Sequence, residues 1–440
     1  MPNSLFSKPV IGIDLGASYT KVSFRPGWKS GKRYEARSQL VNIDRDPLIP
    51  SLAILTRKGW IFGQEAAEYT PKPADQVYQN WKARIFSDSR SEDVDASLDA
   101  AGRFFEWLHG RLERARLPVS DSRIKVCLPA FANIEKPAKL LAGKMHRNGW
   151  QNSSISRLEE PRANTLGIFG EGRNCLWQAA GAPEPNPVFR SMFPPGGPLL
   201  EHLYRAVMIG TNPIKKIAVV DVGSFTTDIG IVEIDARGDG DCIYPKKQES
   251  FDLGVINSYE SPLLDALGKR HGFDPATLSF DLKEKIKADV SAGIEVQRLL
   301  PNGVRVLFGT RLGEETANGI CADFANKVHG LIDRCVGDGA DSLVFTGGGF
   351  SIKAFSEKLQ KICRENGYAP YNPFAGQNLQ RMATALGASS VLIDFPVTER
   401  IPDAPSRPSA RDLNYAVCSC HGGNLSCMRC GGTGHYKTGG

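Results

Sequence analysis

The feature that most constrains this chain is a strand-turn-strand pattern that occurs twice, about two hundred residues apart. Segments 11–22 (IGIDLGASYTKV) and 219–232 (VVDVGSFTTDIGIV) each run from apolar residues through Asp-x-Gly and small or hydroxylated residues to a second apolar stretch. Glycine lets the backbone turn tightly, so that its N–H groups can face an anion. Two such turns on two equivalent lobes would hold a polyphosphate from both sides.

Both turns also carry groups that suit a phosphate bound together with a metal ion. The hydroxyls able to donate to phosphate oxygens are those of Ser18, Thr20, Ser224, Thr226 and Thr227. A carboxylate beside a phosphate is repulsive without a cation, so Asp14, Asp221 and Asp228 imply hydrated Mg²⁺ between them. Two ordinary β-hairpins are the alternative, because Asp and Gly favour turns in any context. The chain contains no GxxxxGK[ST] loop, which excludes a P-loop enzyme.

A third glycine-rich turn follows the second one in the sequence. It contains Gly347, Gly348 and Gly349 within the segment FTGGGFSI. Residues without side chains would let a nucleoside lie against the backbone. A plain strand-to-helix turn is the alternative, but the order of the three turns favours adenosine, and ATP or ADP is the expected ligand.

The chain alternates strand and helix patterns and is too long for one simple core, which predicts an α/β protein of several parts. We expect a first lobe at 9–180, a proline-rich insertion at 181–213, a second lobe at 214–395, a linker at 396–415 and a cysteine module at 416–436. The final helix of the second lobe is expected to return to the first.

Composition bounds the possible partners and location. The net charge of +6 over 440 residues is too weak to indicate nucleic acid. No apolar stretch approaches the roughly 18 residues of a membrane span. The first residues lack the pattern of a signal peptide. A cytoplasmic protein without a membrane partner is therefore expected.

Four of the ten cysteines lie close together near the C-terminal end, and they are Cys418, Cys420, Cys427 and Cys430. Two close thiolate pairs with glycines between and after them suit a tetrahedral Zn²⁺ site. In a reduced compartment a metal is favoured over disulfides. Free thiols, redox chemistry and contact with nucleic acid are the alternatives.

The three turns in this order resemble the actin, hexokinase and heat-shock-chaperone ATPase superfamily. The closest resemblance, over roughly 9–395, is to the nucleotide-binding domain of the 70-kilodalton heat-shock chaperones. It rests also on the segments IPSLAIL…WIFGQEA, VYQNWKARIF, IKVCLPAFANIEKPAKLLAGKMHRNGW and RLEEPRANTLGIFG. The resemblance implies a two-lobed actin-like ATPase fold, in which duplicated ribonuclease-H-like lobes enclose a nucleotide cleft.

The same resemblance implies roles for individual residues. Lys82 and Mg²⁺ would neutralise charge on the transferred γ-phosphoryl group, and Glu160 would orient or deprotonate the attacking water. Thr226 would hold the phosphate in line, and Asp221 completes the catalytic set. The residues expected to contact the nucleotide are Asp14, Gly16, Ala17, Ser18, Tyr19, Gly223, Ser224, Phe225, Thr226, Asp228, Gly347, Gly348 and Gly349.

Several positions depart from the family pattern. Ala17 replaces a threonine, and Ser224 and Phe225 replace two glycines, changes expected to slow hydrolysis or to favour nucleotide sensing. The segment DLKEKIKADVSAG is only loosely similar to the adenine-contacting helix. Fewer than fifty residues follow Phe395, in place of the peptide-binding domain of the chaperones. Among them, CxxCGGTG resembles the zinc-binding repeat of J-domain co-chaperones.

The expected function is therefore a chaperone-like ATPase without the usual peptide-binding domain. It would bind and slowly hydrolyse Mg-ATP as a conformational switch for a protein partner, docked through the insertion or the zinc module. A polymerising actin-like ATPase, a small-molecule kinase of the same superfamily and a non-enzymatic scaffold are the alternatives. The motifs around Lys82 and Glu160 favour the chaperone branch over filament formers.

Overall fold

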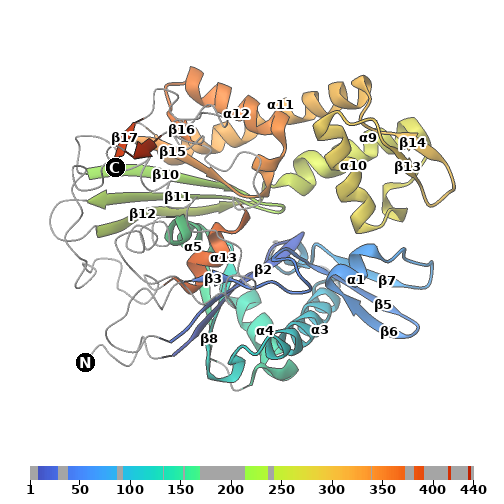
Figure 1. Cartoon of the computed structure of the whole chain (residues 1–440), viewed down its shortest axis with the longest axis horizontal. Coiled ribbons are helices and arrows are strands. Elements are labelled where there is room, and N and C mark those ends of the chain that lie inside the picture. The colour runs from blue at the N-terminus through green and yellow to red at the C-terminus, as the bar shows by residue number, and fades with distance from the viewer. Residues whose placement is uncertain are drawn as a thin grey trace.

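The computed structural model describes most of the chain between residues 8 and 390. The described residues are 8–27, 38–86, 93–131, 133–151, 154–168, 214–235, 242–337, 339–371, 381–390, 415–417 and 435–437. Within them the chain is a mixed α/β protein whose two largest sheets lie one above the other (Figure 1). The α/β class predicted from the sequence is confirmed at this level.

The first sheet contains the first Asp-x-Gly turn. Its strands are β1 (Val10–Asp14), β2 (Tyr19–Arg25), β3 (Gln39–Leu40), β4 (Ile49–Pro50), β8 (Arg123–Leu128) and β9 (Ser154–Glu159). They run in the order β3-β2-β1-β8-β9, with β4 paired to β2. Strand β1 pairs antiparallel with β2 and parallel with β8, and every residue of β1 is buried.

The second sheet repeats this arrangement around the second turn. Its strands are β10 (Ile214–Val222), β11 (Thr227–Asp235), β12 (Cys242–Phe251), β15 (Ser342–Thr346) and β16 (Pro370–Tyr371), in the order β12-β11-β10-β15-β16. Strand β10 pairs antiparallel with β11 and parallel with β15, as β1 does with β2 and β8. Both turns are thus hairpin turns at the end of a central strand.

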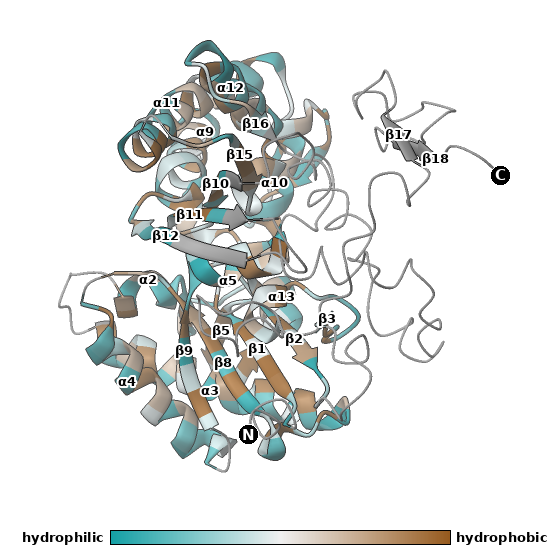
Figure 2. Cartoon of the chain, turned by 90° about the vertical axis from the view of Figure 1, so that its left-hand side faces the viewer, coloured by the Kyte–Doolittle hydropathy of each residue, from teal (hydrophilic) through white to brown (hydrophobic). Residues whose placement is uncertain are grey.

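Each sheet has its own helices and apolar core (Figures 1 and 2). Helices α3 (Asp93–Arg114) and α4 (Glu135–Met145) belong to the first core, where Phe104 and Trp81 pack edge to face. Helices α11 (Arg311–Val336) and α12 (Lys353–Glu365) belong to the second, where the rings of Phe324 and Phe355 stack at 4.5 Å. The buried apolar residues of α3 recur at helical spacing.

Helices α5 (Glu160–Leu166) and α13 (Ala383–Ser389) lie between the two sheets (Figure 1). They pack against each other, and α13 also contacts β1 and β2. Glycine is required at this crossing, because a Cβ on Gly387 would overlap the carbonyl oxygen of Ala163, and one on Gly167 would overlap that of Ala383. The two helices therefore approach at backbone distance.

Smaller elements extend from each sheet on the same side of the molecule (Figure 1). On the first they are β5 (Leu52–Thr56), β6 (Gly59–Phe62), β7 (Gln76–Gln79) and α1 (Gly63–Glu68), whereas α2 (Trp81–Phe86) packs on α3. On the second they are α9 (Ser261–His271), α10 (Phe280–Ala292), β13 (Gln297–Leu299) and β14 (Arg305–Leu307). Helix α10 is capped by Ser279, whose hydroxyl accepts from the Leu282 amide, and it ends at the left-handed Gly293.

The insertion predicted at 181–213, most of the linker at 396–415 and all four zinc-ligand candidates lie outside the described residues. On either side of those cysteines in the sequence, β17 (Tyr415–Val417) and β18 (His435–Lys437) pair antiparallel. Within the described parts of the chain, no helix combines the length and apolar character needed to cross a membrane.

Candidate functional site

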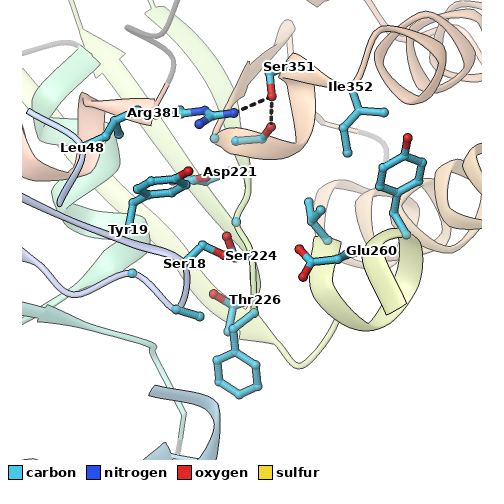
Figure 3. A pocket seen from close by; sticks show the side chains of 18 of the residues that line it. Ser18, Tyr19, Leu48, Asp221, Ser224, Thr226, Glu260, Ser351, Ile352 and Arg381 are labelled. Carbon is cyan, nitrogen blue, oxygen red and sulfur yellow. Dashed lines mark hydrogen bonds between the residues drawn. The ribbon is translucent and has the colours of Figure 1, made fainter. Parts of the chain in front are cut away.

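A cavity of about 450 Å³ opens between the two sheets, at the point where the three predicted turns meet (Figure 3). Its walls come from the turns after β1 and β10, from α10, from the 3-10 turn Gly348–Ser351 and from the start of α13. The predicted residues that line it are Asp14, Gly16, Ala17, Ser18, Tyr19, Lys82, Glu160, Asp221, Gly223, Ser224, Phe225, Thr226, Asp228, Gly347 and Gly348. Segments more than three hundred residues apart in sequence therefore share one site.

Gly349 is the exception among the predicted contacts. It does not line the cavity, because it packs on β10, where an added Cβ would lie 2.6 Å from Cγ1 of Val222. Glycine is required more strictly at position 347 than at position 349. Its φ of +93° and its closeness to the Asp221 carboxylate exclude a side chain.

Two of the five predicted hydroxyl donors also lie outside the cavity. Thr20 bonds the hydroxyl of Ser51 at 2.9 Å, and Thr227 donates to the carbonyl of Leu253 at 2.6 Å. Both threonines are buried. The hydroxyl donors that line the cavity are Ser18, Ser224 and Thr226.

The first turn is held from outside by Ser51. Its hydroxyl donates to the carbonyl of Gly16 at 2.7 Å, and its amide donates to the carbonyl of Ser18 at 2.8 Å. Across the hairpin, the ammonium of Lys21 lies 2.6 Å from Oδ2 of Asp14, its register partner. Lys21 was not predicted as a site residue, although the hairpin register alone places it opposite the aspartate.

The second turn is closed by the amide of Gly223, which donates to the carbonyl of Thr226 at 2.8 Å. The hydroxyl of Thr226 donates to Oδ2 of Asp228 at 2.9 Å, and Ser250 donates to the other oxygen of that carboxylate. These bonds fix Asp228 at one end of the cavity. We call this end the floor, and its carboxyl groups are those of Asp14, Glu160, Asp221 and Asp228.

The predicted catalytic residues Lys82, Glu160 and Asp221 are held by two separate sets of hydrogen bonds. Lys82 of α2 donates to Oε1 of Glu160, the first residue of α5. One helical turn later, Asn164 donates to Oδ2 of Asp221, and Thr384 of α13 donates to the same oxygen at 3.1 Å. Asn164 was missed, although the spacing of four residues from Glu160 puts both on one helix face.

Burial and mutual repulsion raise the pKa values of carboxyl groups at the floor of the cavity. Burial, with help from Asp228 and Asp14, raises the pKa of Asp221 to about 7. Burial also raises the pKa of Glu160 and of Asp228, against the opposing effect of Lys82. Burial alone would lower the pKa of Lys82, but the charges of Glu160, Asp14 and Asp228 together outweigh it and raise that pKa.

The floor therefore holds four carboxyl groups and only two lysines, Lys21 and Lys82, among the residues described. A divalent cation would relieve this imbalance of charge. In the part of the chain that the structure describes, no three His, Cys, Asp or Glu side chains are placed to hold an ion directly. The predicted Mg²⁺ was expected to reach the acids through water.

The other end of the cavity carries charged groups that the sequence did not single out. Lys287 of α10 donates to Oε2 of Glu260 at 2.6 Å and to Glu284. Figure 3 shows Glu260 on one wall and Arg381 with Tyr19 on the opposite wall. The loosely similar segment DLKEKIKADVSAG thus supplies part of the wall as α10.

Ala17 and Phe225, one from each of the first two turns, come together beneath these turns. Ala17 and Phe225 belong to one buried apolar cluster with Ile256, against which Ala83 and Phe131 also pack. The rings of Phe225 and Phe131 meet edge to face at 6.2 Å. The side chain of Phe225 is therefore packed against apolar residues, next to the acidic floor of the cavity.

The site combines backbone turns, hydroxyl donors, two lysines and an acidic floor, which is suited to a phosphorylated ligand bound with a cation. A scan against models of known protein families finds no match to this chain, and a search of curated proteins finds no relative.

Proposed function

We propose that this chain is a slow ATPase whose nucleotide-dependent closure acts as a conformational switch for a protein partner. The observation that carries the proposal is the meeting of two glycine turns, the Lys82–Glu160 pair and three further carboxylates in one cavity. Each of these elements comes from a different part of the chain. Phosphoryl transfer needs mainly positioning and charge stabilisation, which this set can supply.

The fold proposed is the two-lobed actin-like one, with 9–180 and 214–395 as duplicated ribonuclease-H-like lobes. It is supported by the equal pairing of β1 and β10, each antiparallel to the next strand and parallel to a later one. Asp14 is the last residue of β1 and Asp221 the last but one of β10, and each is paired across its own hairpin, with Lys21 and Asp228 respectively. A nucleotide between the lobes would meet one such aspartate from each side.

In the proposed reaction, water attacks the γ-phosphorus of ATP, and the bond to the β-phosphate oxygen breaks to give ADP and phosphate. Glu160 takes the proton of the attacking water, for which its raised pKa is suited. Lys82 offsets negative charge on the transferred group. Asn164 and Thr384 orient Asp221. Asp14, Asp221 and Asp228 are the residues that would hold Mg²⁺ through water, and the ion would supply further positive charge.

The decisive experiment is ATP hydrolysis by the purified protein with Mg²⁺, beside Glu160→Ala and the control Glu159→Ala. Glu159 precedes the catalytic candidate but contacts Arg157 instead of lining the cavity. We expect slow turnover that disappears in Glu160→Ala, with ATP binding kept, and that persists in Glu159→Ala. ATP binding without turnover by the wild type would make the protein a sensor and refute the ATPase assignment.

The zinc part of the proposal rests on the sequence of the C-terminal cysteines. Cys418, Cys420, Cys427 and Cys430 would hold one Zn²⁺ with a closed ligand shell, which gives the module a structural role in docking a partner. Metal analysis of the purified chain should find one zinc per chain, and Cys427→Ser should lose it. A zinc-free wild-type protein, prepared without chelator, would refute this part alone.

A further inference from the structure

Arg381 stands out among the cavity residues because its guanidinium is only partly bonded. Its Nη2 donates to the hydroxyl of Ser351 at 2.8 Å, and that hydroxyl donates to the carbonyl of Gly348 at 2.6 Å (Figure 3). The guanidinium carbon lies 5.9 Å from the centroid of the Tyr19 ring. These contacts fix the plane of the guanidinium at the cavity wall.

One nitrogen of this group has no partner. Nε of Arg381 is buried, and it makes no hydrogen bond to any residue that the structure describes. A buried donor left unbonded is costly, and a guanidinium donor is more so because it is charged. The group lies beside the glycine turn, since a Cβ added to Gly348 would be 3.6 Å from Nε. An acceptor on a ligand in the cavity would satisfy it.

The charges of the cavity indicate which ligand group this is. Lys21 and Lys82 both lie at the acidic floor, where each contacts a carboxylate. Arg381 lies beside Gly348 of the third turn, and the described residues place no carboxylate in ion-pair contact with it. A nucleotide that extends from this turn to the floor would pass Arg381 where its sugar joins the first phosphate.

We propose that Arg381 binds the phosphate nearest the nucleoside, and is thus a specificity residue for nucleotides over nucleosides. This inference rests on the proposed function. The planar guanidinium suits a phosphate because it donates two parallel hydrogen bonds, which a lysine cannot do. Tyr19 and Ser351 hold it in the required orientation, and the α-phosphate oxygens accept from Nε.

The test is the binding of adenosine, AMP and ADP to the wild type and to Arg381→Ala, measured by competition with a fluorescent ADP. We expect Arg381→Ala to weaken AMP and ADP about tenfold to a hundredfold and to leave adenosine unchanged. Arg381→Lys should lose less, because the charge remains. Lys358→Ala, which removes a cation from the exposed face of α12, should change nothing.

A second measurement tests the proposal if adenosine binds too weakly to be compared with AMP and ADP. The ³¹P resonance of the α-phosphorus in bound ADP should shift between the wild type and Arg381→Lys, while the β-phosphorus shifts less. Equal loss for adenosine and AMP, a shift confined to the β-phosphorus, or no loss at all would overturn the proposal. A wild type that binds ADP and ATP in these assays preserves the proposed function whatever the variants do, whereas no nucleotide binding by the wild type refutes both.

Discussion

The ammonium of Lys82 donates to Oε1 of Glu160, and the two side chains are 5% and 4% exposed. Removing two charges from water is costly, and each partner recovers much of that cost from the other. The pair therefore links the stability of the α2–α5 contact to the chemistry of the site, and variants can separate the two effects.

Removing one partner should be worse than removing both. Lys82→Met leaves Glu160 buried without a counter-charge and should lower the free energy of unfolding by roughly 3–5 kcal/mol. The double variant Lys82→Met/Glu160→Gln should recover much of this loss while remaining inactive. Urea-induced unfolding measures the stabilities. If the double variant is as unstable as the sum of the single ones, the two residues are not energetically coupled.

The stability of the nucleotide-free, metal-free protein should fall as the pH rises from about 4 to 7. The folded state holds a proton on Asp221 up to about pH 7, whereas the unfolded chain releases it near its ordinary pKa. More protons are thus bound to the folded state within this window, so the free energy of unfolding decreases with pH, by at most about 1.4 kcal/mol per pH unit.

Asp221→Asn should reduce this slope, because the amide cannot ionise. Asp323→Asn, at an exposed position of α11, should leave it unchanged. Thermal melts in the presence of a chelator at several pH values provide the measurement. An identical slope in wild type and Asp221→Asn would mean that other groups cause the pH dependence.

The apolar cluster of Ala17, Phe225 and Ile256 should contribute to the free energy of unfolding. Phe225→Ala removes a buried ring that meets Phe131, and the expected loss is about 3–5 kcal/mol. Val77→Ala, at a more exposed position, should cost far less. Chemical unfolding of both variants gives the comparison, and a Phe225→Ala protein as stable as the wild type would contradict the packing described.

The α5–α13 crossing gives a matched pair of glycine variants. Gly387→Ala would force a Cβ into the carbonyl of Ala163 and should destabilise the protein severely. Gly330→Ala lies on the exposed face of α11 with open space around it and should stabilise the helix by up to about 1 kcal/mol. Equal melting temperatures of these two variants would contradict the close approach of the helices.

The sequence pattern located much of the cavity, because the relevant signals are local. Each Asp-x-Gly turn follows a buried strand, and its position could be read without knowing the rest of the fold. Strand alternation also explains why Thr20 and Thr227 do not line the cavity. Tyr19 and Lys21 face the cavity, so Thr20 between them faces away, and the same holds for Thr227 between Thr226 and Asp228.

Other site residues could not be predicted, because only tertiary packing brings them to the cavity. Arg381, Lys287 and Glu260 lie on separate elements, and no local pattern links them to the turns. Three consecutive glycines likewise carry no signal about which of them faces the cavity, and Gly349 packs on β10 instead. For the equivalent strand pairing of β1 and β10, the repeated turn was the one signal that the sequence analysis used.

The crossing of α5 and α13 also has a mechanical consequence. The glycine contact lies close to the cavity, whereas β6 and the β13–β14 hairpin lie at the far ends of the two layers (Figure 1). For any rotation of one sheet against the other about this fulcrum, displacement grows with distance from it. A small closure around a ligand in the cavity would therefore produce a larger displacement at β6 and at the β13–β14 hairpin. A partner bound at these outer ends would sense the larger movement.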